Sequence, residues 1–346
     1  MLLAKHIKVL HITQPDLITE RYFKFIQEKF DVSEHEILIR DVGRPGNLGV
    51  NLKSSTVGGL AWFFNFLFKG LIAEKIVLHG MSDIRIAIML FFFRGLCKKT
   101  YWVIWGGDLY QYNEPRNRKW TVMEFFRRPV IRSLAHIVTY IPGDYELAVK
   151  WYGAKAAYHE CVMYPSNVFV GDVVSEKGSE VICVQAGNSA DPGNYHFEIL
   201  DKLSAYKGAV EVFVPLSYGD EESARQVIDY GAEVFGGNFH ALTKLMSFEE
   251  YMSYLSKVDI AIFNHRRQQA MGNTISLLGM GKKVFIRSDV TPWRLFVSQG
   301  LIIGDVENFD LSLLTPDEAR YNSDIIRETY SFDRLYSQWK GVFDGR

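Results

Sequence analysis

The sequence predicts an α/β protein made of two doubly wound parallel-sheet domains. Its 346 residues suffice for two domains of roughly 100–200 residues, each with a core of its own. Short β-rich runs alternate with helical patterns along the chain, which is typical of βαβ units and a parallel sheet. Between two such series lies a segment with little periodicity that is rich in Pro, Asn and Gly, residues 164–178. We predict the interdomain linker there.

The first series of elements forms an N-terminal domain that we place at residues 1–172. We predict its strands at residues 7–12, 36–39, 75–78, 100–104 and 137–140. We predict its helices at residues 17–30, 60–72, 83–96, 121–135 and 143–151. Lysines interrupt the apolar run of the opening segment, so we expect the first strand there and no secretory signal.

The second series forms a C-terminal domain that we place at residues 173–322. We predict its strands at residues 181–186, 210–215, 232–235, 259–263 and 283–286. We predict its helices at residues 194–205, 221–230, 247–256, 273–280 and 292–299. The remaining residues, 323–346, contain one further helical stretch at 323–343, which we expect to pack back on the first domain. Doubly wound sheets bind ligands at the carboxyl ends of their strands, and we look for sites there.

The charge of the chain is divided between the two halves. The net charge of −1 argues against a general nucleic-acid binder, which is usually basic. Residues 1–172 carry 22 basic and 16 acidic side chains, whereas the remainder carries 17 and 24. Three segments of the basic half combine aromatic and cationic residues: 60–73, 91–99 and 116–133. Such segments settle at an anionic membrane surface, although each one alone also fits a core-facing helix with a charged outer face.

Other motifs narrow the function classes. Three cysteines without a C-x-x-C pair fit a reducing compartment, and no apolar run reaches the roughly 20 residues that span a bilayer. We therefore expect a cytoplasmic protein that can lie on a membrane. The sequence has no H-E-x-x-H, Walker or G-x-S-x-G element, so it predicts neither a metal centre nor a serine nucleophile, and no cofactor.

Two loops of the second series have the composition of a phosphate or sugar site. The first follows strand 181–186, where Gly187, Asn188 and Ser189 open a turn that leads into a helix. A helix N-terminus presents free N–H groups and the positive end of a dipole, which suit a phosphate or a polar sugar. The alternative is an ordinary βα loop in which Asn194 caps the helix.

The second loop follows strand 259–263 and is the stronger candidate. Guanidinium charge, amides and a glycine precede an apolar helix, a combination that suits a diphosphate. The candidate residues are Arg267, Gln268, Gln269, Gly272 and Asn273. The alternative is a solvated loop whose arginines face water. Tyr218, in the turn after strand 210–215, is a candidate wall for a nucleoside or sugar, with a common turn as the competing interpretation.

The first domain also carries candidate site residues where its strands end. Strand 100–104 ends in Trp105, Gly106, Gly107 and Asp108. Paired glycines let the backbone approach a ligand, and Asp108 is a candidate base that accepts a proton from an acceptor hydroxyl. The competing interpretation makes Asp108 a helix N-cap. His79 follows strand 75–78 as a candidate substrate contact, although a lone histidine at a strand end is also commonly structural.

Taken in order, these motifs resemble one family of enzymes. They run along the chain as Trp105-Gly106-x-Asp108-Leu109-Tyr110, Gly187-Asn188-Ser189 with Asn194 and His196, Pro215-Leu216-Ser217-Tyr218-Gly219, and Arg267-Gln268-Gln269-x-x-Gly272. The set is similar to the bacterial TDP-N-acetylfucosamine:lipid II N-acetylfucosaminyltransferases, also called 4-α-L-fucosyltransferases. The resemblance extends from about residue 102 to residue 292.

The resemblance implies a GT-B glycosyltransferase, with two Rossmann-like domains, the donor in the C-terminal one and the acceptor in the N-terminal one, and no metal. It implies transfer of an N-acetylfucosamine-like deoxy-amino sugar from a TDP-sugar to a polyprenyl-diphosphate-linked oligosaccharide. The place would be the cytoplasmic face of the inner membrane, in the synthesis of enterobacterial common antigen. The alternatives are a transferase that uses a UDP- or GDP-sugar with another acceptor, and a non-catalytic nucleotide-sugar-binding module.

Within this interpretation the candidate residues take separate roles. Arg267 would stabilise the departing diphosphate, and Asp108 would be the base in an inverting reaction or an acceptor-orienting group in a retaining one. One position departs from the pattern. Many GT-B enzymes have a glutamate early in the helix after the donor loop that binds the ribose hydroxyls, and Ser276 stands at that position here. We expect Gln268 or Gln269 to substitute for that carboxylate.

Overall fold

The computed structural model describes residues 7–40, 51–172 and 181–345, which divide into two compact units. Unit 1 comprises Met1–Ser166 together with Phe332–Arg346, and unit 2 comprises Asn167–Ser331. The chain therefore leaves unit 1 once and returns to it for its last helix. Of the expected linker, residues 173–178 lie outside the described part, as does the start of the expected C-terminal domain.

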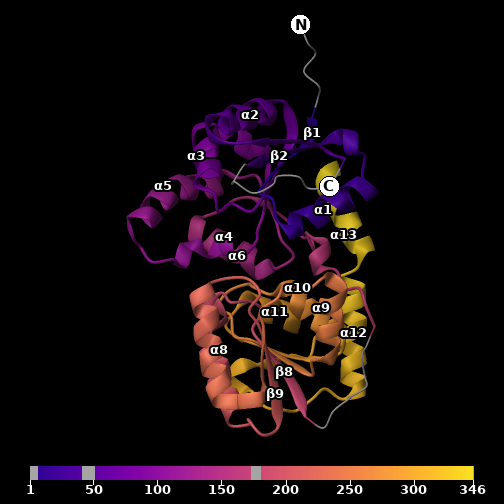
Figure 1. Ribbon diagram of the computed structural model, residues 1–346. Coiled ribbons are helices and arrows are strands. Elements are labelled where there is room, and N and C mark those ends of the chain that lie inside the picture. The colour runs from indigo at the N-terminus through magenta and orange to yellow at the C-terminus, as the bar shows by residue number, and fades with distance from the viewer. Residues whose placement is uncertain (1–6, 41–50, 173–180, 346) are drawn as a thin grey trace. The chain divides into compact units, whose positions relative to one another are not determined.

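Unit 1 is built on a seven-stranded parallel sheet with the order β3-β2-β1-β4-β5-β6-β7 (Figure 1). Its strands are β1 (Ile7–Thr13), β2 (His35–Arg40), β3 (Lys53–Val57), β4 (Ala73–His79), β5 (Thr100–Val103), β6 (His136–Val138) and β7 (Ala157–His159). Its α-helices are α1 (Leu17–Lys29), α2 (Gly59–Ile72), α3 (Ile84–Phe92), α4 (Gly107–Tyr110), α5 (Arg118–Ser133), α6 (Pro142–Tyr152) and α13 (Phe332–Asp344).

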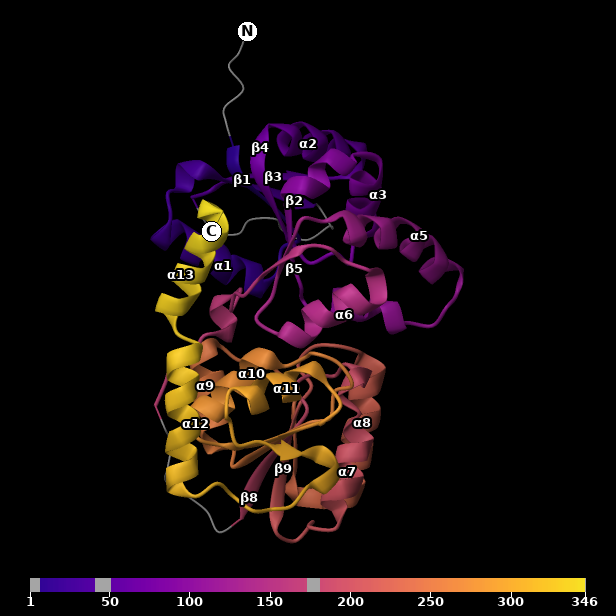
Figure 2. The same ribbon diagram turned by 180° about the vertical axis from the view of Figure 1, so that it is seen from behind.

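The helices of unit 1 cover both faces of this sheet. Side chains of α2, α3, α5 and α6 share one apolar core with Leu10 and Ile12 of β1. His11 lies between those two residues and contacts the rings of Tyr22 and Phe343. Because successive side chains of a strand alternate between faces, α1 and α13 cover the face opposite to that core. Figure 2 shows α1 and α13 side by side.

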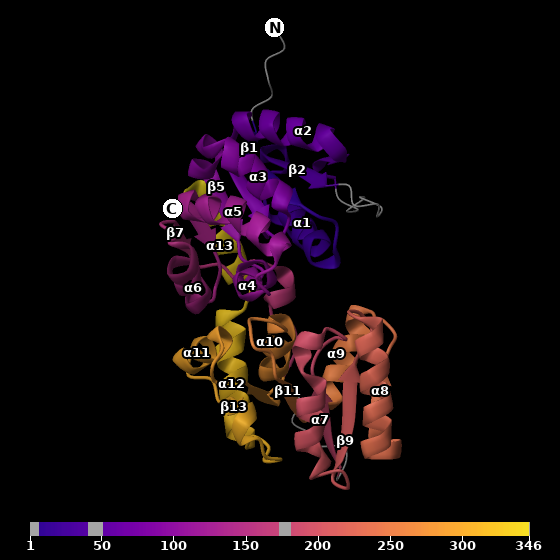
Figure 3. The same cartoon turned by 90° about the vertical axis from the view of Figure 1, so that its left-hand side faces the viewer.

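Unit 2 is built on a six-stranded parallel sheet with the order β10-β9-β8-β11-β12-β13 (Figure 3). Its strands are β8 (Ile182–Ala186), β9 (Val210–Pro215), β10 (Phe239–Leu242), β11 (Ile260–Phe263), β12 (Lys283–Ile286) and β13 (Gly304–Asp305). Its α-helices are α7 (His196–Ser204), α8 (Glu221–Phe235), α9 (Phe248–Lys257), α10 (Met271–Gly279), α11 (Thr291–Ser298) and α12 (Pro316–Thr329). Two doubly wound parallel sheets confirm the predicted fold class.

Two predicted elements are wrong in kind. The strand expected at 232–235 is the last turn of α8, because Val227, Gly231 and Phe235 keep a spacing of four and bury one helical face. The strand that pairs with β9 is β10, which begins after a short turn at Gly236–Asn238. The single helix expected at 323–343 is two helices, since α12 ends at Thr329 and α13 begins at Phe332 in the other unit.

Besides β10, three strands escaped prediction because they lie at sheet edges and lack an apolar run. β3 has the sequence KSSTV and is mostly exposed, β7 has only three residues, and β13 has two. Each edge strand pairs on one side alone, so its side chains need not be hydrophobic on both faces. Among the described residues, no helix is both long and apolar enough to cross a bilayer.

Candidate functional site

The loop after β8 is shaped by a glycine, and any other residue at that position would displace the neighbouring side chains. Gly187 has φ +69°, and a Cβ placed there would lie 2.6 Å from His196 Nε2 and 2.7 Å from Asn194 Oδ1. Its N–H donates to the carbonyl of Ile262 at 2.9 Å, which ties the turn to β11. The chain can therefore pass this close to the start of α7 only because the side chain is absent.

Asn194 joins the two candidate loops of unit 2 and is not the helix cap considered from the sequence. Helix α7 begins at His196, and its N-cap is Tyr195. The Asn194 side chain is fully buried, and its Oδ1 accepts the N–H of Asn188 at 2.8 Å and lies 2.9 Å from His265 Nε2. His265 must carry its proton on Nε2, because an amide oxygen only accepts. Burial lowers the pKa of His265 to about 3, so the ring stays neutral.

Three of the predicted donor residues lie next to one another. The Asn188 amide donates to the Tyr218 hydroxyl at 3.0 Å, and the Gln269 amide donates to Asn188 Oδ1 at 3.4 Å. A parallel bridge between Ala190 and Gly219 fixes the turn that carries Tyr218, whose side chain is 55% exposed. The ring of Tyr218 is thus held by its hydroxyl and leaves apolar surface open to a ligand.

The loop before α10 combines a cation with free hydrogen-bonding groups. Arg267 is about one-third exposed, with a guanidinium nitrogen 3.9 Å from Asp191 Oδ2, so its charge is only loosely paired. Ala270 precedes α10 in the left-handed conformation, with φ +56°, and no side chain caps the helix. Gly272 and Asn273 lie in the first turn of this helix, where backbone N–H groups have no intrahelical acceptor.

Two amide oxygens in the same loop have no partner. Oε1 of Gln268 and Oε1 of Gln269 are buried and accept no hydrogen bond within the described structure. An unpaired buried acceptor costs free energy, and native proteins usually fill it with a ligand or water. These two oxygens are suited to a hydroxyl or N–H donor of a ligand. Ser276 lies farther along α10 and is half-buried.

In unit 1 the predicted base is enclosed by donors. Asp108 is 1% exposed, and its Oδ1 accepts the N–H groups of Trp105 and Leu109 at 2.9 and 3.0 Å. Its Oδ2 accepts the Met81 N–H at 2.9 Å and the Trp102 indole N–H at 2.6 Å. Four donors fill the positions that a carboxylate offers. This geometry favours a role in joining the turns after β4 and β5, and the role of base stays a prediction that the geometry does not support.

His79 belongs to a buried chain of hydrogen bonds along one face of the unit 1 sheet. The Trp105 indole donates to the Tyr164 hydroxyl at 2.6 Å, and that hydroxyl lies 2.8 Å from His79 Nδ1. His79 Nε2 lies 3.1 Å from His11 Nδ1, and His11 Nε2 lies 3.0 Å from His35 Nδ1. The indole can only donate to Tyr164, and the histidine protons all lie on Nε2 when Tyr164 donates to His79, or all on Nδ1 when His79 donates to Tyr164.

The environment of this chain keeps its histidines neutral. Burial lowers the pKa of His79 to about 3 and that of His35 to about 4, and it lowers the pKa of His11 well below the ordinary value. Both nitrogens of His79 are occupied inside the unit. His79 therefore offers a ligand only the edge of its ring. Neither of its nitrogens is free to form a hydrogen bond with a substrate.

A small cavity of about 140 Å³ opens at the carboxyl ends of β1, β2, β4 and β5. It brings together His79 and Trp105 of the predicted acceptor side, whereas Gly106, Gly107 and Asp108 do not line it. Sequence reasoning missed one part of its wall, the ion pair between Arg40 Nε and Asp83 Oδ2 at 2.7 Å. Asp83 also caps α3 by accepting the Arg85 N–H, and only the register of β2 brings Arg40 to it.

Comparisons with known proteins agree with this architecture. The family model described as 4-alpha-L-fucosyltransferase glycosyl transferase group 56 matches residues 71–309. A glycosyltransferase from Rickettsia africae is similar in structure, with 10% identity, coverage of 98% of each chain and a TM-score of 0.67. WaaG, a glycosyltransferase involved in lipopolysaccharide biosynthesis, has 11% identity, coverage of 97% of this chain and 98% of that one, and a TM-score of 0.63.

A third similar structure holds a nucleotide. Anabaena Alr3699/HepE in complex with UDP and glucose has 10% identity, coverage of 99% of this chain and 95% of that one, and a TM-score of 0.61. At such low identity these likenesses establish the fold alone. The fold of the two parallel-sheet units is GT-B.

Proposed function

The chain belongs to the 4-alpha-L-fucosyltransferase family, glycosyl transferase group 56, and from this premise we propose that it transfers an N-acetylfucosamine-like sugar from a TDP-sugar to a polyprenyl-diphosphate-linked oligosaccharide. The protein is a glycosyltransferase of the GT-B fold. The identity of donor and acceptor belongs to the proposal. So does the place, the cytoplasmic face of the inner membrane, and the purpose, a bacterial surface polysaccharide such as enterobacterial common antigen.

The observation that carries the proposal is that the loop before α10 holds several polar groups whose hydrogen-bonding capacity is not used within the described structure. A loosely paired guanidinium, an uncapped helix N-terminus and two unpartnered amide oxygens lie in one stretch of seven residues, Arg267–Asn273. A nucleoside diphosphate presents the matching groups, since its phosphates accept from N–H donors and its ribose hydroxyls and base N–H donate. Gln268 and Gln269 are thereby suited to the hydroxyl contacts that a glutamate makes in many GT-B enzymes.

The transfer step follows from this arrangement. The acceptor hydroxyl oxygen forms a bond to the anomeric carbon, the bond from that carbon to the diphosphate oxygen breaks with its electron pair on that oxygen, and the hydroxyl proton passes to water. Negative charge grows on the leaving diphosphate, where Arg267 and the first N–H groups of α10 stabilise it. Gly187, Asn188, Ser189 and Tyr218 form the rest of the donor surface. On the acceptor side, the cavity at the carboxyl ends of β1, β2, β4 and β5 supports binding of a part of the acceptor.

Calorimetry with nucleotides tests the diphosphate site. Arg267→Ala removes a charged donor, and we expect the affinity for TDP to fall roughly 10- to 100-fold. The matched control is Arg266→Ala, because Arg266 pairs with Glu198 at 2.8 Å and stacks on Tyr195. We expect that variant to bind TDP as the wild type does.

The donor class is decided by comparing TDP, UDP and GDP in the same measurement. Tightest binding of UDP or GDP would replace TDP in the proposal and leave the site in place. Unchanged affinity of the Arg267→Ala variant for all three would contradict the diphosphate role. An assay with a polyprenyl-linked acceptor then separates an enzyme from a binding module, since a module binds the nucleotide-sugar without releasing the nucleotide.

A further inference from the structure

Helix α2 is apolar on two opposite faces. Trp62, Phe66 and Gly70 point inward and are buried in the core of unit 1. The outward face carries four residues at helical spacing that are 61% to 76% exposed: Leu60, Phe64, Phe68 and Leu71. A helix on the surface of a soluble protein usually turns polar residues outward. The outer face of α2 therefore has the composition of a contact surface.

The neighbouring helices extend this apolar face. Phe92 at the end of α3 and Phe125 in α5 are 68% and 62% exposed. Both rings contact Phe91, with centroids 5.4 and 5.7 Å away. Since α2, α3 and α5 share one core, they cover the same face of the sheet. We call the exposed residues Leu60, Phe64, Phe68, Leu71, Phe92 and Phe125 the outer apolar face.

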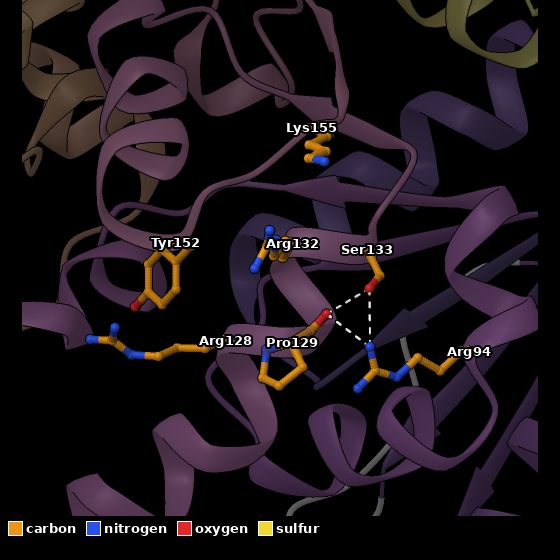
Figure 4. A pocket seen from close by; sticks show the side chains of 7 residues that line it. All are labelled: Arg94, Arg128, Pro129, Arg132, Ser133, Tyr152 and Lys155. Carbon is orange, nitrogen blue, oxygen red and sulfur yellow. Dashed lines mark hydrogen bonds between the residues drawn. The ribbon is translucent and has the colours of Figure 1, made fainter.

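A basic pocket adjoins this face. It has a volume of about 620 Å³ and is lined by four cationic side chains and no acidic one: Arg94, Arg128, Arg132 and Lys155. Figure 4 shows these side chains spread around the pocket, with Pro129 and Ser133 between them. The Arg94 guanidinium lies 5.0 Å from the centre of the Phe91 ring, so the pocket and the phenylalanines are continuous.

The charges of the pocket are largely uncompensated. Arg132 and Lys155 are exposed and have no ion-pair partner among the residues that the structure describes. Arg94 donates to the Ser133 hydroxyl at 3.2 Å, which neutralises nothing, and only Arg128 has a carboxylate partner, Glu124 at 3.2 Å. Such a pocket attracts a phosphate group.

The pocket is separate from the proposed acceptor cavity. Arg94 opens the turn before β5, Arg132 lies in the last turn of α5 before β6, and Lys155 precedes β7. These segments lead into the amino ends of the strands, whereas the cavity with His79 and Trp105 lies at their carboxyl ends. The phosphate that fits the basic pocket is therefore not the one at the site of sugar transfer.

We propose that unit 1 docks on a bilayer of anionic phospholipid, with the outer apolar face inserted at the acyl boundary and a lipid phosphate in the basic pocket. A bilayer interface presents both chemistries side by side, apolar chains for the phenylalanines and leucines and phosphates for the cations. The competing occupant is a second copy of this chain, because its residues 173–346 carry 24 acidic and 17 basic side chains, and the oligomeric state separates it from a bilayer. The inference rests on the proposed function in one respect, since a polyprenyl-linked acceptor is held in a membrane.

Vesicle flotation with the full chain tests this surface. We expect binding to phosphatidylcholine vesicles that contain phosphatidylglycerol, and at least about tenfold weaker binding to phosphatidylcholine alone or at high salt. Arg132→Glu with Lys155→Glu should weaken binding to the anionic vesicles about tenfold or more. Phe64→Ser with Phe68→Ser should reduce binding to a similar extent. The matched control is Lys207→Glu with Lys244→Glu, exposed positions of unit 2, which should bind as the wild type does.

Three results would overturn the proposal. One is equal binding to neutral and anionic vesicles, and a second is an Arg132→Glu, Lys155→Glu variant that binds anionic vesicles normally. The third is a wild-type dimer in light scattering that the serine variant converts to a monomer, because it assigns the face to a second copy of the chain. Vesicle binding needs no turnover, so it can succeed where sugar transfer fails. Nucleotide binding by the docking variants should remain normal, which also shows that they fold.

Discussion

The carboxyl-end edges of the two sheets occupy equivalent positions in equivalent folds, but the polar residues that the sequence singles out there, Asp108 and His79 in unit 1 and Gln268 and Gln269 in unit 2, differ in how far the fold satisfies them. In unit 1 the buried carboxylate of Asp108 accepts four hydrogen bonds, and His79 uses both ring nitrogens within the unit. In unit 2 the amide oxygens of Gln268 and Gln269 have no partner among the residues that the structure describes, and Arg267 is only loosely paired. A site ready for a polar ligand is marked by groups that the fold leaves unsatisfied.

The largest expected effect is in unit 1. Asp108→Ala leaves four buried donors without an acceptor, and we expect a loss of about 3–4 kcal/mol in the free energy of unfolding, measured by urea titration. Asp108→Asn keeps the side-chain volume and one acceptor oxygen, so we expect it to lower the free energy of unfolding by a smaller but still measurable amount. If Asp108→Asn unfolds like the wild type and yet transfers sugar at least about 100-fold more slowly, Asp108 is the base after all and the contrast between the two edges fails.

An intermediate effect is expected at the close approach in unit 2. Gly187→Ala combines a left-handed backbone with a Cβ that would meet His196 and Asn194, and we expect it to cost about 2–4 kcal/mol and to weaken nucleotide binding. Gly153 has the same φ of +69°, but a Cβ placed there would have no atom within 4 Å, so Gly153→Ala is the control. It should cost about 1–2 kcal/mol. Equal losses for the two variants would show that backbone strain alone acts at Gly187.

The smallest effect on stability is expected at an unsatisfied group. Gln268→Leu removes an acceptor that has no partner in the described part of the chain, so the free energy of unfolding of the nucleotide-free protein should stay within about 0.5 kcal/mol or rise. The same substitution should weaken nucleotide binding about tenfold in calorimetry, because a ligand donor loses its acceptor. A large loss of stability with unchanged nucleotide affinity would instead place Gln268 in the scaffold and remove the distinction from unit 1.

The sequence by itself determined the fold class and most elements of both units. Alternation of apolar strands with amphipathic helices is a local property, and it is readable wherever a strand is buried on both faces, as in β1, β4 and β11. It failed at the polar edge strand β3, and it failed at residues 232–235, where a β-rich composition hid the continued helical spacing of α8. In both cases the secondary structure depends on which faces of the segment are buried by the elements that pack against it.

The tertiary structure alone decided which polar residues are available. The sequence offers Asp108, His79 and Gln268 on the same ground, as polar residues that follow predicted strands. Only packing brings the Trp102 indole and the Met81 N–H to Asp108, and only the register of β1 with β2 and β4 places His11 between His35 and His79. Hydrogen bonds are short and directional, so whether a group is satisfied depends on residues distant in the chain. The spacing of a motif along the chain cannot carry that information.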